Sequence, residues 1–88
     1  MNKVDNIENK SFLFLEVSKA VYLEGYRVLL TFNNGETKTV DFQNELNGTI
    51  YEPLRQLDNF KKFQVKYNTI EWANGADYAP EYLYEIGS

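Results

Sequence analysis

A tight turn between two alternating runs of residues constrains this fold more than any other feature of the chain. The turn is Asn33-Asn34-Gly35, and Asn-Gly is a preferred hairpin pair because both residues tolerate a positive φ. The run before it, 26–32, carries a large apolar residue at every second position, and the run 36–42 does so at Val40 and Phe42. A period of two is typical of a half-buried strand, so the pattern predicts a β-hairpin.

A further strand is predicted before this hairpin. The run 12–23 opens with four apolar residues, and an opening of this kind indicates burial on both faces. From residue 17 onward the run alternates, and we expect Val17, Val21 and Leu23 on the core face. With a Glu-Gly turn leading into the next run, the three strands predict an antiparallel meander.

The two prolines mark two predicted short helices. Proline has no N–H to lose in the first turn of a helix, so Pro53 suits the start of a helix that ends at Asp58-Asn59. Pro80 suits the start of another after the turn Asn74-Gly75. The inward-facing residues that we expect are Leu54 and Leu57 in the first helix, and Tyr82, Leu83 and Ile86 in the second.

A second hairpin is predicted between these helices. The run 63–67 alternates, Asn68 supplies a tight turn, and the run 69–72 consists of good strand formers. The inward-facing residues that we expect are Phe63, Val65, Tyr67, Ile70 and Trp72. These elements predict an α+β fold: a three-stranded antiparallel meander plus a C-terminal β-hairpin with two short helices. A chain of 88 residues allows one small domain, assigned to 12–86, with 1–11 as a polar N-terminal tail or arm.

Composition removes several function classes. The chain has no histidine and no cysteine, which excludes Ser-His-Asp and Cys-His catalysis and ordinary zinc sites, and no cofactor is predicted. A net charge of −4 disfavours general binding to nucleic acids or anionic membranes. No apolar run approaches the ~20 residues of a membrane helix, and residues 1–11 lack the apolar core of a signal peptide. We therefore expect a cytoplasmic protein with no membrane partner.

The order of these marks resembles a known family. The marks are the hairpin 30–36, the stretches 40–42 and 48–55, Phe60, and the final block 69–85, which holds Trp-x-Asn-Gly-x-Asp-x-x-Pro-x-x-Leu-Tyr. They resemble the bacterial family called domain of unknown function 2442, with Ala73 standing where that family usually has proline. The resemblance spans most of the chain and implies a compact α+β fold. This family has no established biochemical activity, so the resemblance does not imply a function.

One group of residues is a candidate protein-binding surface, because Tyr, Trp and Arg are enriched at binding hot spots. The group consists of Arg55, Trp72, Tyr78, Tyr82 and Tyr84, and the candidate surface also includes Asn74 and Asp77. We expect Trp72 and Tyr82 in the core and Tyr78 and Tyr84 at the surface. Tyr78 and Tyr82 are four residues apart, so we also expect them to stack along one side of the second helix. The sequence thus predicts a non-enzymatic interaction or regulatory module, which binds a protein partner or itself through a sheet edge or this tyrosine surface.

A second hypothesis is a small-ligand or weakly enzymatic domain that uses Asp77, Arg55 and Asn74, and it requires these three residues to meet in one pocket. For Asp77 a simpler interpretation is a cap, whose carboxylate accepts from backbone N–H groups after the turn. The sequence leaves the identity of any small molecule open.

A third hypothesis is nucleic-acid binding through Lys61, Lys62 and Lys66, which alternate with aromatic residues. An outward row of lysines on an edge strand explains the same pattern, and the acidic balance of the chain favours that explanation.

Overall fold

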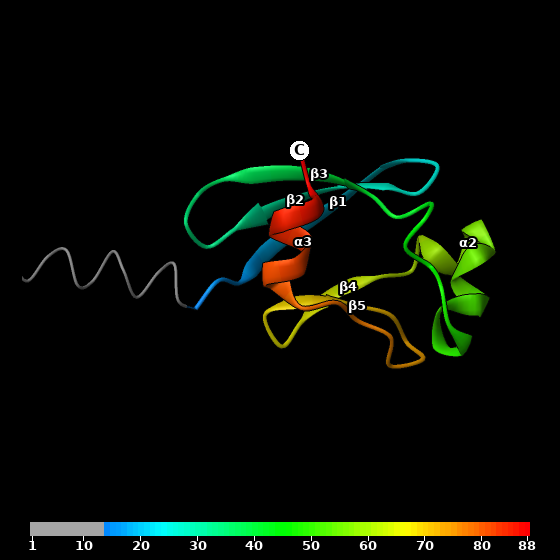
Figure 1. The fold of residues 1–88 in the computed structure, drawn as a ribbon. Helices are drawn as coiled ribbons and strands as arrows, with labels where there is room; N and C mark the ends of the chain where they lie inside the picture. The colour runs from blue at the N-terminus through cyan, green and yellow to red at the C-terminus, as the bar shows by residue number, and fades with distance from the viewer. Residues whose placement is uncertain (1–13) are drawn as a thin grey trace, which may run out of the picture.

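The structure, a computed structural model, describes residues 14–88 and places them in two small antiparallel sheets with three short helices (Figure 1). One sheet has the order β1-β2-β3 and the other is the hairpin β4-β5. In chain order the elements are β1 (Val17–Glu24), β2 (Arg27–Phe32), β3 (Thr37–Asp41), η1 (Thr49–Arg55, a 3-10 helix), α2 (Leu57–Phe60), β4 (Gln64–Lys66), β5 (Thr69–Glu71) and α3 (Pro80–Ile86). The predicted α+β fold, meander and second hairpin are confirmed. The predicted boundary between residues 11 and 12 lies outside the described residues.

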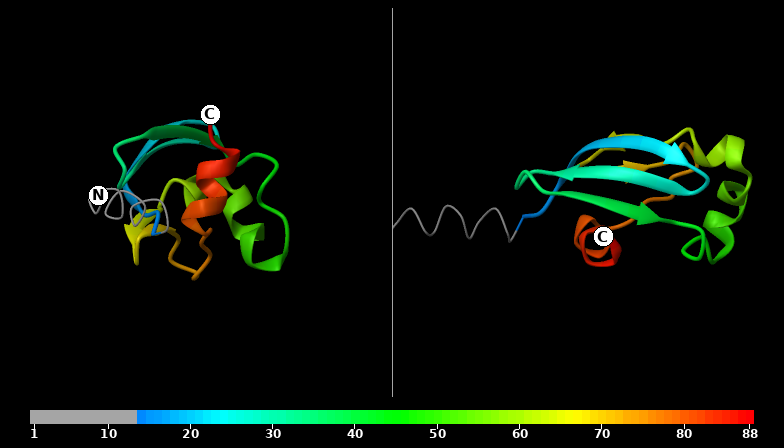
Figure 2. Two further views of the ribbon diagram at one scale, coloured as in Figure 1. Left: turned by 60° about the vertical axis from the view of Figure 1, so that its left-hand side comes forward. Right: turned by 90° about the horizontal axis from the view of Figure 1, so that it is seen from above.

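One face of the three-stranded sheet is covered and the other is open. The β4-β5 hairpin packs beneath β1, and α3 packs beneath β3 (Figure 1). Seen from above, the β4-β5 hairpin lies behind the β1 side of the sheet, and α3 lies along the β3 edge (Figure 2, right). Within residues 14–88, no helix or strand covers the upper face, which we call the outer face of the sheet.

Strands β2 and β3 have the faces that their alternation predicts. Their inward side chains are almost completely buried: Val28, Leu30, Phe32, Val40 and Phe42. The loop between them closes with two backbone hydrogen bonds, in which Phe32 N–H donates to Glu36 O and Gly35 N–H to Phe32 O. Gly35 has φ +89°, a backbone conformation that glycine adopts without steric strain because it has no Cβ. The same two bonds recur at Trp72–Ala76, where Gly75 has φ +91°, so the Asn34-Gly35 and Asn74-Gly75 turns have one geometry.

Strand β1 contains two bulges. Its pairing with β2 shifts by one residue between Val17 and Lys19, and again between Tyr22 and Glu24, so β1 carries one extra residue at each place. An extra residue moves every following side chain to the opposite face of the sheet. The faces of β1 therefore cannot be obtained by counting every second residue along it.

The first bulge reverses the faces predicted for β1. Val17 is buried as predicted, but beyond the bulge Ala20 and Tyr22 pack against the core. Val21 and Leu23 are 41% and 42% exposed, so their predicted place in the core is wrong. The physical reason is that Ser18, the inserted residue, interrupts the alternation.

Other apolar side chains that were predicted to be buried are also exposed, among them Phe14, Val65 and Tyr67. Tyr67 is 81% exposed because it lies in the β4-β5 turn, where Tyr67 and Asn68 both have positive φ. This two-residue turn ends β4 at Lys66, so the predicted strand does not reach Tyr67. Val65 pairs with the buried Ile70 but is still 38% exposed. Phe63, which precedes β4, is half-buried and packs against the core as predicted.

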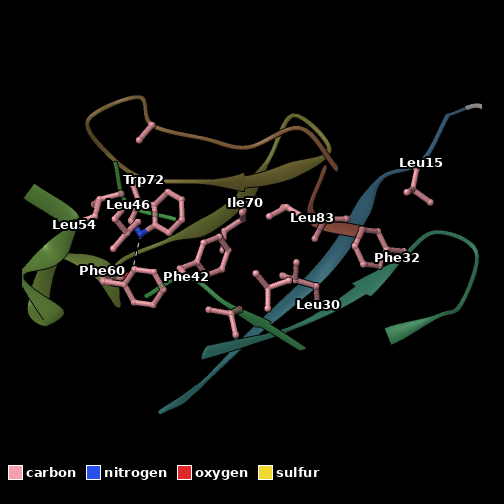
Figure 3. Packing of buried hydrophobic residues seen from close by; sticks show 14 residues of the cluster. Leu15, Leu30, Phe32, Phe42, Leu46, Leu54, Phe60, Ile70, Trp72 and Leu83 are labelled. Carbon is pink, nitrogen blue, oxygen red and sulfur yellow. Dashed lines mark hydrogen bonds between the residues drawn. The ribbon is translucent and has the colours of Figure 1, made fainter. Parts of the chain in front are cut away.

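The core is built around a group of aromatic rings at one end of the domain (Figure 3). The ring centroids of Phe42 and Phe60 lie 5.6 Å apart, and that of Trp72 lies 5.8 Å from Phe42 and 5.6 Å from Phe60. The indole N–H of Trp72 donates to Phe60 O at 2.8 Å, which satisfies a buried carbonyl (Figure 3). This bond joins β5 and its following turn to the end of α2. Trp72 is 2% exposed, so its predicted burial is confirmed.

The middle helices differ from the prediction in where they break. Pro53 lies inside η1 instead of starting a helix, and Asp58 and Asn59 lie inside α2 instead of ending one. The break falls at Gln56, whose extended backbone (φ −80°, ψ 119°) separates the two helices. Leu54 is buried as predicted, whereas Leu57 is 36% exposed. None of the helices within residues 14–88 has the length and apolar character needed to cross a membrane.

Candidate functional site

Three tyrosines form a stack on the side of the core, which we call the tyrosine stack: Tyr51, Tyr78 and Tyr82. The ring centroids of Tyr51 and Tyr78 are 4.9 Å apart at 20° between the planes, and those of Tyr78 and Tyr82 are 6.1 Å apart at 15°. The stack joins η1, the loop after β5 and helix α3, three segments that are far apart in the sequence. The predicted contact between Tyr78 and Tyr82 is therefore confirmed.

Each hydroxyl of the tyrosine stack donates to a fixed acceptor. Tyr78 donates to Glu45 O at 2.6 Å, Tyr51 donates to Asp77 O at 2.6 Å, and Tyr82 donates to the carboxylate of Glu45. Because these donors are used inside the domain, the stack holds the loop that contains Glu45 against the rest of the fold. The first role of these tyrosines is therefore structural.

The environment of the stack raises the pKa of all three tyrosines. Burial is the largest cause for Tyr78, followed by the nearby Tyr51, Glu45 and Tyr82, and its pKa lies well above the ordinary value. Burial also raises the pKa of Tyr51, with Asp77 as the second cause. For Tyr82 the hydrogen bond to Glu45 is the main cause of the raised pKa. These phenols therefore act as hydrogen-bond donors and are poorly suited to act as general bases.

The predicted exposures of these tyrosines are partly wrong. Tyr82, expected in the core, is 41% exposed, because Leu83 and not Tyr82 is the fully buried residue of α3. Tyr78, expected at the surface, is half-buried between its two stacking partners.

Tyr84 fastens α3 to the β2-β3 hairpin. It is half-buried, its ring packs edge-on against Phe32 at 5.2 Å, and Lys38 Nζ lies 4.4 Å from its ring centroid. Its hydroxyl donates to the Glu36 carboxylate, and this hydrogen bond is the main cause that raises the pKa of Tyr84. Its predicted place at the surface therefore holds only in part.

The residues of the small-ligand hypothesis do not meet in one pocket. A shallow cavity of about 230 Å³ lies beside Trp72 and Asn74, but neither Arg55 nor Asp77 lines it. Its volume is also below the ~300–1,000 Å³ typical of ligand pockets. The lining residues are Pro53, Leu54, Asn59, Lys62, Trp72, Ala73 and Asn74.

Arg55 and Asn74 each hold a loop in place. Arg55 Nε donates to Leu46 O at 3.0 Å, and the Asn74 amide donates to Ile50 O at 2.8 Å and accepts from Ala76 N–H at 3.1 Å. The backbone N–H of Ala76 thus donates to the side chain of Asn74. The sequence predicts instead the carboxylate of Asp77 as the acceptor for backbone N–H groups at this turn.

The cap prediction for Asp77 is wrong. Asp77 is exposed and forms an antiparallel bridge with Glu71, and this extended pairing ends before the helix start at Pro80. Helix α3 begins with Ala79 at its N-cap and without a side-chain cap. The functional use of Asp77 thus remains a prediction, since only its backbone carbonyl has an assigned partner, Tyr51.

The three lysines of the nucleic-acid hypothesis are exposed but do not lie on one strand. Lys61 and Lys62 follow α2 in a turn, and Lys66 ends β4. Lys61 lies 5.5 Å from the Tyr22 ring centroid, and Lys62 lines the cavity described above. Within residues 14–88, no group of three or more acidic side chains gathers in a way that could hold a metal ion.

The outer face of the sheet carries an apolar patch that sequence reasoning missed. Val21 on β1 pairs with Leu29 on β2, and Leu23 follows at the second bulge. Val21 and Leu23 are 41% and 42% exposed, and Leu29 is half-buried. We call these three residues the outer apolar patch. The one sign of it in the sequence is that β1 and β2 carry apolar residues at both alternating sets of positions.

Comparison with known proteins identifies the family. A family model described as "Protein of unknown function (DUF2442)" matches residues 17–87, which is most of the chain. A search of curated proteins and a search of solved structures each found no match. The matched range runs from the first residue of β1 to the residue after α3, so it includes every strand and helix described above. The chain belongs to the family of proteins of unknown function DUF2442.

Proposed function

We propose that this domain is a non-enzymatic protein-interaction module that binds its partner through the outer face of the three-stranded sheet. The observation that supports this is the outer apolar patch, which lies on a face that no described helix or strand covers. In antiparallel sheets with one solvated face, the solvated side is usually polar. Exposed apolar side chains grouped on such a face are typical of a binding surface.

The surroundings of the patch suit a protein partner. The outward residues on the same face include Lys19, Arg27, Thr31 and Thr39, so an apolar centre has a polar rim. Such a pattern is common at protein interfaces. The tyrosine stack supports the fold instead of supplying this surface, so the sheet face replaces the C-terminal tyrosines as the proposed contact.

A non-catalytic role has support from the side-chain chemistry. The sequence has no histidine or cysteine, and Arg55 and Asp77 lie away from the cavity that Asn74 lines. The nucleic-acid alternative has weaker support, because the net charge is −4 and the three lysines are divided between two segments. We place the module in the cytoplasm, where a small domain without disulfides is common.

The test compares two exposed valines. Val21→Thr makes the patch polar and keeps a β-branched residue in the strand, whereas Val65→Thr makes the same change on β4, where Val65 is 38% exposed. Wild type and both variants are used as baits in nuclease-treated extract of the native cells. The proposal expects one protein, retained in stoichiometric amount, to be bound by wild type and Val65→Thr and lost by Val21→Thr. It is refuted if wild type and Val21→Thr retain the same proteins, or if none of the baits retains any.

A further inference from the structure

The two edges of the three-stranded sheet are not equivalent. At the β3 edge, Thr39 exchanges two backbone hydrogen bonds with Ser88, at 2.9 and 3.0 Å. At the β1 edge, the one such bond within residues 14–88 is Val17 N–H to Asn68 O at 2.9 Å, at the start of the strand. From Lys19 to Glu24 the outward backbone groups of β1 have no partner among the described residues. An edge of this kind favours pairing with another strand.

The side chains along this free edge are self-complementary. The segment Lys19-Ala20-Val21-Tyr22-Leu23-Glu24 has a positive charge at one end, a negative charge at the other and four uncharged, largely apolar residues between them. When two copies of such a segment run antiparallel, each lysine comes near the glutamate of the other copy. Lys19 has no ion-pair partner among residues 14–88, and the Glu24 side chain is 73% exposed although it bonds Arg27 at 3.1 Å.

The second bulge brings the complementary groups to the same face. Lys19 and Val21 pair with the outward residues Thr31 and Leu29, and beyond the bulge Glu24 pairs with Arg27, which is also outward. In an antiparallel pair, residues directly opposite each other share a face. A pairing centred on Val21 therefore sets Val21 against Val21 of the second copy. It also sets Lys19 beside Leu23 and Glu24 of that copy.

From this geometry we propose that two copies of the chain associate through antiparallel pairing of their β1 strands, at the edge of the sheet and not over its outer face. The pairing forms one continuous six-stranded sheet with a two-fold axis at Val21, and it joins the two outer apolar patches into a single row across the axis. This inference goes beyond the proposed function, because edge pairing leaves the joined outer face open to the partner of that function.

The first test is charge exchange between two variants. The dimer has two equivalent contacts, each between residue 19 of one copy and residue 24 of the other. In a Lys19→Glu homodimer both contacts become Glu–Glu, and in a Glu24→Lys homodimer both become Lys–Lys. When the two variants are mixed, both contacts become Glu–Lys again. Sedimentation equilibrium should show that each variant alone dimerises roughly tenfold more weakly than wild type, and that the mixture regains dimer. The double variant Lys19→Glu/Glu24→Lys should also dimerise. Equal dimerisation of both single variants and wild type would overturn the charge contact.

The second test is cross-linking, which the absence of native cysteine makes clean. Cβ atoms directly opposite in an antiparallel pair lie ~4.5–5.5 Å apart, within reach of a disulfide, so Val21→Cys should form a covalent dimer on mild oxidation. Leu29→Cys is the matched control, because Leu29 pairs with Val21 on the same face. In the proposed dimer the two Leu29 residues are three strand spacings apart, about 14 Å, which is too far for a disulfide.

Each outcome of the second test decides between arrangements. Faster cross-linking of Val21→Cys than of Leu29→Cys supports edge pairing. Faster cross-linking of Leu29→Cys indicates stacking of the two outer faces and overturns it. A wild-type chain that is monomeric at every concentration, with neither variant cross-linking, also overturns it. In that last case, a different protein lost by the Val21→Thr bait would still support the proposed function, so the two failures are distinguishable.

Discussion

Removal of a single hydroxyl group tests the structural role of the tyrosine stack. Tyr78→Phe keeps the ring between Tyr51 and Tyr82 and deletes only the hydroxyl that donates to Glu45 O at 2.6 Å. The matched control is Tyr67→Phe, because Tyr67 is 81% exposed and its hydroxyl has no hydrogen-bond partner among residues 14–88.

The magnitude follows from what happens to the Glu45 carbonyl. A net hydrogen bond contributes about 0.5–1.5 kcal/mol, and a buried acceptor left without a donor costs more. Glu45 is half-buried, so water can replace the lost donor in part. We therefore expect Tyr78→Phe to lower the free energy of unfolding by about 1 kcal/mol, which is ~4–8 °C in Tm for a domain of this size. Tyr78→Ala also removes the ring contacts and should cost about 2–3 kcal/mol, less than a fully buried aromatic.

Urea unfolding followed by the fluorescence of Trp72 measures these changes directly, because Trp72 is the only tryptophan and is buried in the core. Tyr67→Phe should stay within about 0.5 kcal/mol of wild type. Equal stability of the two Phe variants would refute the structural role of the Tyr78 hydroxyl. If Tyr78→Ala remained as stable as wild type, the stack itself would be dispensable, and Tyr78 would again be a candidate for partner binding.

Two further predictions concern the same core. Trp72→Phe removes the bond to Phe60 O and leaves a void beside it, so the free energy of unfolding should fall by about 2–4 kcal/mol in thermal unfolding followed by circular dichroism; a fall below about 1 kcal/mol would contradict the role of the bond. The second prediction is a pH dependence. The fold raises the pKa of Tyr78 above the value near 10 of an unfolded chain, so the folded state holds the phenolic proton more tightly. Its contribution is complete below pH ~10 and is lost as the pH rises towards the folded pKa, so stability should fall at alkaline pH, and less steeply in Tyr78→Phe; equal slopes would argue against the raised pKa.

The parts of the fold that could be predicted depend on local rules. The β2-β3 hairpin combines a regular alternation with an Asn-Gly turn, and both signals lie within a few residues of each other. Helix α3 begins at Pro80 as expected, because proline suits the first helical position. The burial of Trp72 follows from its place beside Ile70 on a short strand. In each case neighbouring residues carry the information.

The tyrosine stack could be predicted only in part, because its contacts are not local. The Tyr78–Tyr82 contact follows from a spacing of four residues, but Tyr78 also donates to a carbonyl 33 residues earlier in the chain, and Tyr51 donates to one 26 residues later. No local pattern marks a backbone carbonyl as the acceptor of a distant hydroxyl. The exposure of Tyr78 was therefore misjudged even though its stacking partner was correct.

The error in β1 and the proposed interaction surface have the same physical origin. If β1 had no bulge at Ser18, Val21 would face the core, and the outer face would carry smaller or polar side chains at these positions. The bulge instead moves Ala20 and Tyr22 inward and leaves Val21 exposed. The ring centroid of Tyr22 then lies 6.4 Å from that of Phe60. Bulges occur more often at sheet edges and commonly end or redirect strand pairing. Here the bulges have a different effect, because they bring Lys19, Val21 and Glu24 to one face of a free edge. A bulge that only protected the edge from pairing would not need to place a lysine and a glutamate on either side of an exposed valine. The arrangement of Lys19, Val21 and Glu24 therefore favours β1 as a pairing surface.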